Sequence, residues 1–124
     1  MENKKVLVVD DEHFISRSLS FMLKKEGYDC LTAGDGVEAM EVVRGEKPDL
    51  IFLDINMPKK DGYAVCKEIK EDAELKDIYI IMLTAKGQEA DKEKGLALGA
   101  NEFMLKPFDP RLVRERVKEI FEGE

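Results

Sequence analysis

Residues that build many metal and redox centres are scarce in this sequence of 124 residues. His13 is the only histidine, so no second imidazole can help it to bind a metal or to form a catalytic pair. We interpret it as a solvated residue at the start of a helix. The two cysteines, Cys30 and Cys66, fit no metal-ligand spacing and lie in a strand-like and a helix-like run. Both are expected to be small core residues in a reducing cytosol.

Basic stripes and long apolar runs are missing as well. The formal net charge is −7, so a phosphate-coated partner such as DNA would be repelled. The apolar run at residues 6–9 is far too short for a signal peptide, and no run approaches the length that crosses a membrane. We therefore expect a cytoplasmic protein without direct nucleic-acid binding and without membrane contact.

Five short apolar runs alternate with segments of helical periodicity. The strand-like runs are residues 6–9, 28–33, 50–53, 78–83 and 103–105. The helical segments are residues 15–26, 37–45, 63–69, 87–98 and 110–121, and Asp35 with Gly36 is typical of a turn. This alternation predicts an α/β fold with a parallel sheet covered on both faces, in one domain over residues 1–124. The order of the strands does not follow from periodicity.

Four of the five strand-like runs end on chemically useful side chains. The first is followed by Asp10 and Asp11, the third by Asp54, the fourth by Thr84 and the fifth by Lys106. The carboxyl ends of parallel strands lie at one edge of a sheet, where ligands bind in open α/β folds. We therefore expect three carboxylates, a hydroxyl and an amine to converge there.

This set closely resembles the receiver domain of bacterial response regulators, of the chemotaxis-regulator type. The matching motifs are Asp54-x-x-Met57-Pro58-x-x-x-Gly62, Thr84-Ala85 and Lys106-Pro107-Phe108. The resemblance covers essentially the whole chain. It implies a (βα)5 flavodoxin-like, doubly wound, five-stranded parallel sheet with strand order 2-1-3-4-5. It also implies a phospho-acceptor signalling switch of two-component systems, which catalyses its own phosphorylation and dephosphorylation and is not a conventional enzyme.

The resemblance assigns the phosphoryl chemistry to particular residues. Asp54 is the implied phospho-acceptor, with Thr84 and Lys106 neutralising charge on the phosphoryl oxygens. Mg²⁺ prefers oxygen ligands and keeps several waters. Its implied ligands are Asp11, Asp54, the backbone carbonyl of Asn56 and, through water, Asp10.

Other residues are implied to tune the switch and to meet its partners. Asn56 and Lys86 would flank the acyl phosphate and set its lifetime. Thr84 and Phe103 would couple phosphorylation to the surface formed by residues 87–98, the fifth strand and the last helix. That surface would be read by a downstream protein or by a dimer mate.

The first helical segment predicts a docking face for a sensor histidine kinase or a phosphotransfer protein. Phe14 and Phe21 fall on a stripe beside the core stripe, which contains Ile15. We expect Phe14, Ile15 and Phe21 to meet the kinase. The alternative is that the two rings fold back as the margin of the core.

Three other interpretations stay open at this point. A phosphohydrolase of the haloacid dehalogenase type also combines an aspartate nucleophile, Thr, Lys and Mg²⁺, but it needs Asp-x-Asp after the first strand. A flavin-binding flavodoxin would need Ser, Thr and Gly there, where this chain has Asp10, Asp11 and Glu12. The chain is also compatible with a receiver fragment of a larger transcriptional regulator.

Overall fold

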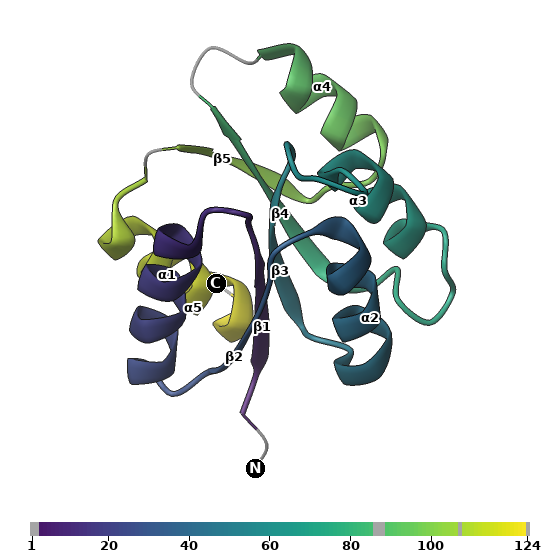
Figure 1. Ribbon diagram of the computed structural model, residues 1–124. Coiled ribbons are helices and arrows are strands. Elements are labelled where there is room, and N and C mark those ends of the chain that lie inside the picture. Colours follow the sequence, from purple (N-terminus) through teal and green to yellow (C-terminus); the bar gives the residue numbers. More distant parts are fainter. Residues whose placement is uncertain (1–2, 86–88, 107, 124) are drawn as a thin grey trace.

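Five parallel strands form one sheet in the order β2-β1-β3-β4-β5 (Figure 1). The computed structural model describes residues 3–85, 89–106 and 108–123. Its strands are β1 (Lys5–Val9), β2 (Asp29–Ala33), β3 (Leu50–Asp54), β4 (Tyr79–Ala85) and β5 (Glu102–Lys106). The α/β class predicted from the alternation of runs is confirmed, and so is the strand order implied by the resemblance.

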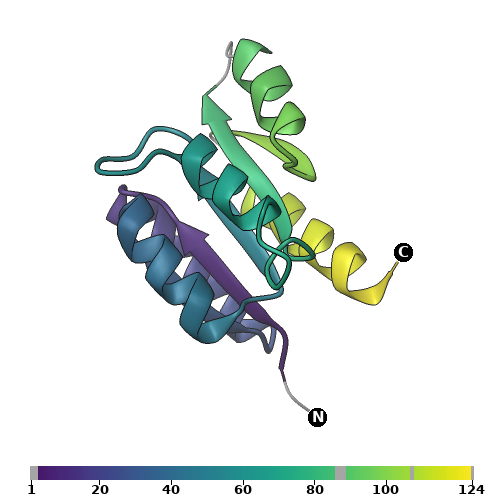
Figure 2. The same ribbon diagram turned by 90° about the vertical axis from the view of Figure 1, so that its right-hand side faces the viewer.

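Helices cover both faces of this sheet (Figures 1 and 2). They are α1 (His13–Lys25), α2 (Gly36–Glu46), α3 (Gly62–Lys70), α4 (Glu89–Ala97) and α5 (Pro110–Glu122). Helices α1 and α5 pack on one face, and α2, α3 and α4 lie on the other. Each helix connects two parallel strands or follows the last, as in a doubly wound fold.

The three central strands are apolar on both faces because each face is covered by helices. Side chains that point toward α2 and α3 include Leu7, Val9, Ile51, Leu53, Ile80 and Met82. Side chains that point toward α1 and α5 include Val6, Val8, Leu50, Phe52, Ile81 and Leu83. All twelve have no more than 1% of their surface exposed. The strand ends that carry polar groups are therefore fixed by a close-packed core.

Short polar side chains mark where the helices begin. The carboxylates of Asp35, Asp61 and Asp109 accept backbone N–H groups at the starts of α2, α3 and α5. Gly27 follows α1 with φ of +94°, a left-handed conformation that favours glycine.

The predicted roles of the scarce residues agree with the structure. Cys30 and Cys66 are buried free thiols, and burial raises the pKa of both, that of Cys66 to about 11. His13 is exposed as the first residue of α1. Within the described residues, no helix has the length and apolarity needed to cross a bilayer.

Candidate functional site

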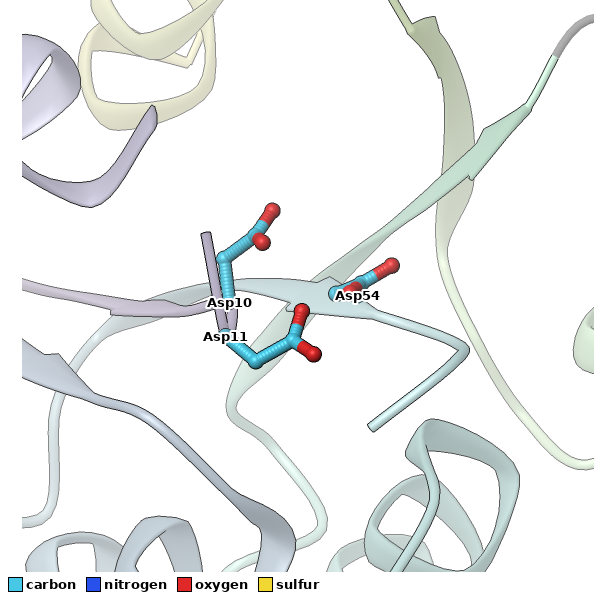
Figure 3. Close-up of side chains that lie close together, drawn as sticks. All are labelled: Asp10, Asp11 and Asp54. Atoms are coloured by element: carbon cyan, nitrogen blue, oxygen red, sulfur yellow. The ribbon is translucent and has the colours of Figure 1, made fainter. Parts of the chain in front are cut away.

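Three aspartates come together at the carboxyl end of the sheet (Figure 3). Asp10 and Asp11 directly follow β1, and Asp54 is the last residue of β3. Because β1 and β3 are neighbours, the chain delivers all three to one place. One carboxylate oxygen of each lies within 4.8 Å of the other two.

The three carboxylates differ in burial. Asp10 has 1% of its surface exposed and Asp54 has 6%, whereas Asp11 is exposed. Asp10 is also fixed by the backbone. Its Oδ1 accepts the N–H of Glu12 at 2.9 Å, and its carbonyl accepts the hydroxyl of Ser16 at 3.3 Å. Asp10 is thus held in a fixed position at the site, whereas Asp11 faces solvent.

Lys106 reaches this cluster from the edge strand β5. Its Nζ lies 2.7 Å from Asp10 Oδ2, 3.3 Å from Glu12 Oε1 and 3.4 Å from Asp54 Oδ1. Strand β4 lies between β5 and β3, so a side chain as long as lysine is needed to cross it. The positive charge of Lys106 partly offsets the negative charge of the aspartates, but its Nζ lies closer to Asp10 than to Asp54.

Thr84 completes the rim of the site on β4. Its backbone position follows Leu83, the partner of Asp54 in the sheet register. Thr84 is 4% exposed, and its buried Oγ1 has no hydrogen-bond partner within the part of the chain that the structure describes. A buried hydroxyl without a partner costs about 1–3 kcal/mol, so its presence here favours a role in binding an added oxygen.

The charges of the cluster shift the pKa values of two groups. Burial raises the pKa of Asp54 to about 6; the nearby Asp10 charge adds to this and Lys106 opposes it. Partial burial alone would lower the pKa of Lys106. The carboxylates of Asp10, Asp54 and Glu12 outweigh burial and hold that pKa above its ordinary value.

The donor set fits a hard divalent cation. Three carboxylates of like charge within reach of one another repel, and Mg²⁺ prefers such oxygen ligands. Asp10, Asp11 and Asp54 would hold the ion, which would neutralise charge on phosphoryl oxygens when bound. Asn56, the fourth residue assigned to it, is exposed two positions beyond Asp54.

The predicted docking residues lie beside this site. Phe14 is 82% exposed and Phe21 67%, so the alternative that their rings fold back into the core is wrong. Ile15, the third predicted docking residue, is only half-buried: part of its side chain packs against the core. A groove of about 350 Å³ runs from Lys106 past Phe108, between α1 and the start of α5. Phe14 and Ile15 line it.

Phe103 lies away from the groove, on the face covered by α4. It is partly buried and packs against the same core cluster as α2 and α3. A Cβ atom added to Gly95 of α4 would lie 2.6 Å from the Cζ atom of its ring, so the ring sits against a helix position without a side chain. Lys86, assigned to phosphate lifetime, lies outside the described residues.

The sequence alone gives no role to two neighbours of the cluster. Glu12 pairs with Lys106, although the sequence marks it only as a third acid after β1. Gly62 packs on Asp54 so closely that an added Cβ would lie 2.3 Å from the carbonyl oxygen of Asp54. The motif spacing names Gly62 but gives no hint of this contact.

A parallel α/β sheet with an acidic cluster, a lysine and a threonine at its carboxyl edge is the arrangement expected of a signalling domain that accepts a phosphoryl group. Residues 6–118 match the family described as the response regulator receiver domain. The chain belongs to this family. It is therefore a two-component signalling domain and not a metabolic enzyme. Receiver domains generally bind Mg²⁺ at an acidic pocket, and this chain has a cluster of three aspartates at the carboxyl edge of its sheet.

Two of the curated proteins to which the chain is similar are named as transcriptional regulators. It is 52% identical over 118 residues to the alkaline phosphatase synthesis transcriptional regulatory protein PhoP of Bacillus subtilis, covering 95% of this chain and 48% of that protein. It is 46% identical over 120 residues to the probable transcriptional regulator ycf27 of Cyanophora paradoxa, covering 97% and 49%. The chain thus spans about half the length of these curated relatives.

Solved structures resemble the fold over nearly the whole chain. A putative response regulator from Chloroflexus aurantiacus has a TM-score of 0.90 and 34% identity, covering 96% of this chain and 98% of that one. The chemotaxis protein CheY4 of Vibrio cholerae has a TM-score of 0.88 and 33% identity, covering 95% and 98%. These likenesses do not favour the haloacid dehalogenase or flavodoxin interpretation.

The pKa of Asp54 predicts how stability depends on pH without metal. Because this pKa is raised from 3.8 to about 6, the folded protein binds more protons than the unfolded chain between those values. The free energy of unfolding should therefore fall as pH rises through that window, by roughly 2–3 kcal/mol, and stay lower above it. Other carboxylates titrate too, so urea unfolding in a chelator should compare wild type with Asp54→Asn. The difference between the two proteins should grow from pH 4 to about pH 7; parallel curves would contradict the shift.

Proposed function

We propose that the chain is a phospho-acceptor switch that receives its phosphoryl group on Asp54 from a sensor histidine kinase or a phosphotransfer protein. The observation that carries this proposal is the meeting of the Asp54 carboxylate with two further aspartates and the Lys106 ammonium. Residues 1–124 act as one receiver unit in the cytoplasm.

The transfer is a displacement at phosphorus. A carboxylate oxygen of Asp54 attacks, the new O–P bond forms, and the P–N bond to the donor histidine breaks, leaving its electron pair on the imidazole nitrogen. The nucleophile must be ionised. A pKa of about 6 without metal, which already includes the lowering effect of the neighbouring Lys106 ammonium, leaves most of Asp54 ionised at neutral pH.

Two side chains of the rim are suited to the charge that the phosphoryl group adds. Lys106 already lies 3.4 Å from Asp54 Oδ1, so it can pair with an oxygen attached there. The buried hydroxyl of Thr84, which has no hydrogen-bond partner among the described residues, can donate to another phosphoryl oxygen. Mg²⁺ held by Asp10, Asp11, Asp54 and the carbonyl of Asn56 would supply the rest of the neutralisation. Asn56 and Lys86 set the lifetime of the acyl phosphate.

The docking face is the exposed side of α1 together with the adjoining groove. Phe14 lines that groove, and Phe21 continues the apolar stripe about two helical turns further along α1. An apolar helix of a kinase bundle laid on this stripe would bring its phosphohistidine near Asp54, because Lys106 lies at the other end of the groove.

Phosphorylation changes the surface formed by α4, β5 and α5, which a partner then recognises. Movement of Thr84 toward the phosphoryl oxygens would free space for Phe103, which lies beneath α4. Phenylalanine lacks a hydroxyl, so this coupling depends on packing alone. The relatives are transcriptional regulators about twice as long as this chain, and a downstream protein domain or a second copy is the partner that we propose for this surface.

Asp54→Asn should keep the fold and abolish phosphorylation, because an amide oxygen is a poor nucleophile. Acid-labile label from acetyl phosphate with Mg²⁺ should fall to background in this variant. Asp29→Asn, an exposed aspartate at the opposite end of the sheet, is the matched control and should label like wild type. Normal labelling of Asp54→Asn would contradict the proposed function.

Phe14→Ala should slow transfer from a cognate kinase about tenfold, as expected for an exposed aromatic anchor worth about 1–2 kcal/mol. Labelling by acetyl phosphate should be unchanged, since a small donor needs no docking face. Val37→Ala removes an exposed apolar side chain from α2, on the other face of the sheet, and should affect neither reaction. Equal loss of both reactions in Phe14→Ala would indicate a damaged fold and not a docking role.

Thr84→Ala should accept phosphate more slowly and lose most of the coupling to α4, whereas Thr84→Ser retains the hydroxyl and should keep it. Amide NMR with beryllofluoride and Mg²⁺, which imitate the phosphoryl group, measures this. Wild-type signals of Phe103 and of residues 92–97 should shift. Shifts confined to the surroundings of Asp54 would rule the output route out.

A further inference from the structure

The loop that carries Asn56 packs directly against the start of α2. This loop, residues 55–61, connects β3 to α3. Gly36 is the first residue of α2 and is buried. A Cβ atom added to Gly36 would lie 1.9 Å from the carbonyl oxygen of Lys60 and 2.6 Å from its carbonyl carbon. The two backbones therefore touch, and no other residue type fits at this position without a shift of the backbone.

The loop has little slack with which to absorb such a shift. At its ends, the N–H of Gly62 donates to the carbonyl of Ile55 at 2.9 Å, and Gly62 packs on the carbonyl of Asp54. In its middle, the N–H of Lys60 donates to the carbonyl of Pro58 at 2.7 Å. A displacement at Lys60 is therefore passed along the loop toward Asn56.

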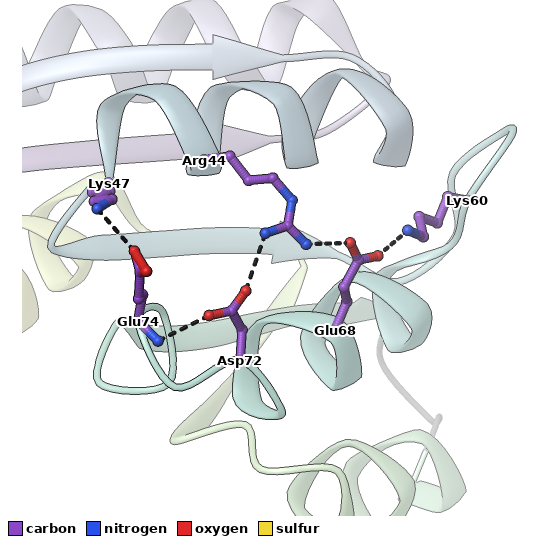
Figure 4. Close-up of polar contacts among 6 residues, drawn as sticks. All are labelled: Arg44, Lys47, Lys60, Glu68, Asp72 and Glu74. Carbon is purple, nitrogen blue, oxygen red and sulfur yellow. Dashed lines mark hydrogen bonds and ion pairs between the residues drawn. The ribbon is translucent and has the colours of Figure 1, made fainter.

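Charged side chains tie the same loop to α2 and α3. Lys59 Nζ lies 3.6 Å from Asp35 Oδ2, and Oδ1 of Asp35 accepts the N–H of Glu38, which holds the first turn of α2. Lys60 pairs with Glu68 of α3, and Glu68 in turn pairs with Arg44 of α2 at 2.7 Å (Figure 4). These pairs are partly exposed and individually weak, so the backbone contact is the main constraint and the charges support it.

We propose that the start of α2, through Gly36 and Asp35, is a positioning element for the phosphorylation site. It holds the loop in the place from which Asn56 can join the aspartates around Mg²⁺. Gly36 and Asp35 touch neither the ion nor the phosphoryl group, so they are positioning residues and not catalytic ones. This inference rests on the proposed function for what the loop does.

Gly36→Ala tests the contact, and Gly45→Ala is its matched control. Both glycines lie in α2, but a Cβ on Gly45 meets no atom within 4 Å. Calorimetric titration should show Mg²⁺ bound about tenfold more weakly by Gly36→Ala, the effect typical of residues that orient metal ligands. Gly45→Ala should bind like wild type and melt at the same or a higher temperature.

A readout without metal separates positioning from general damage. In amide NMR of the Mg²⁺-free proteins, Gly36→Ala should move the signals of residues 55–61 and leave those of β1 and α5 in place. A folded Gly36→Ala protein with wild-type Mg²⁺ affinity would overturn the inference alone. Wild-type protein that binds no Mg²⁺ would overturn the proposed function and the inference together.

Lys59→Gln keeps the test decisive if Gly36→Ala does not fold. Removing a positive charge from this acidic protein would strengthen Mg²⁺ binding by simple electrostatics, whereas loosening the loop would weaken it. Because the Lys59 side chain is 66% exposed, folding should be unaffected. Binding about twofold weaker than wild type would support the positioning role. Unchanged or tighter binding would overturn it.

Discussion

The properties of the site depend on the negative charge that three aspartates concentrate at the carboxyl edge of the sheet. Asp10 and Asp54 are almost fully buried, Asp11 stands beside them, and Lys106 is the cation that the described residues bring within 4 Å of this cluster. Its ammonium lies nearer to Asp10 than to Asp54, so the compensation is uneven. Burial of Asp54, with the Asp10 charge adding to it, raises the pKa of Asp54 even though Lys106 opposes the shift. Without a further cation the site stores repulsion, and binding one would relieve it. Metal affinity, protonation and fold stability are therefore linked at a single place.

The scaffold tolerates this repulsion because the strands that carry it cannot move apart. Phe52 and Leu53, which precede Asp54, are fully buried on opposite faces of the sheet, one against α1 and α5 and the other against α2 and α3. Pulling β3 away from β1 would open both cores at once. Dense packing on each side thus holds carboxylates at separations that they would not adopt in water.

The sequence was sufficient to predict what topology dictates. Strands of a parallel sheet end at one edge, so the alternation of runs is enough to place Asp10, Asp54, Thr84 and Lys106 at the same edge. The strand order came from the resemblance, since periodicity carries no information on neighbours. Contacts made by loops escaped prediction because they depend on the path of the backbone. Gly36 was interpreted as part of a turn, and only the approach of the Lys60 carbonyl gives a physical reason for a glycine there. The exposure of Phe14 likewise depends on what packs beside α1, which helical spacing cannot specify.

The two sides of the site differ in how firmly they are built. On one side, backbone contacts at Gly36 and Gly62 lock the loop after Asp54. On the other, α4 offers little to the core: among residues 92–97 only Gly95 is buried, with the ring of Phe103 against it. A cation–π contact of 4.4 Å between Lys94 and Tyr63 adds a tie between α4 and α3, of the modest strength typical near a surface. A displacement follows the softer side, so the firmness of the α2 contact is itself a reason why the proposed signal would travel toward α4.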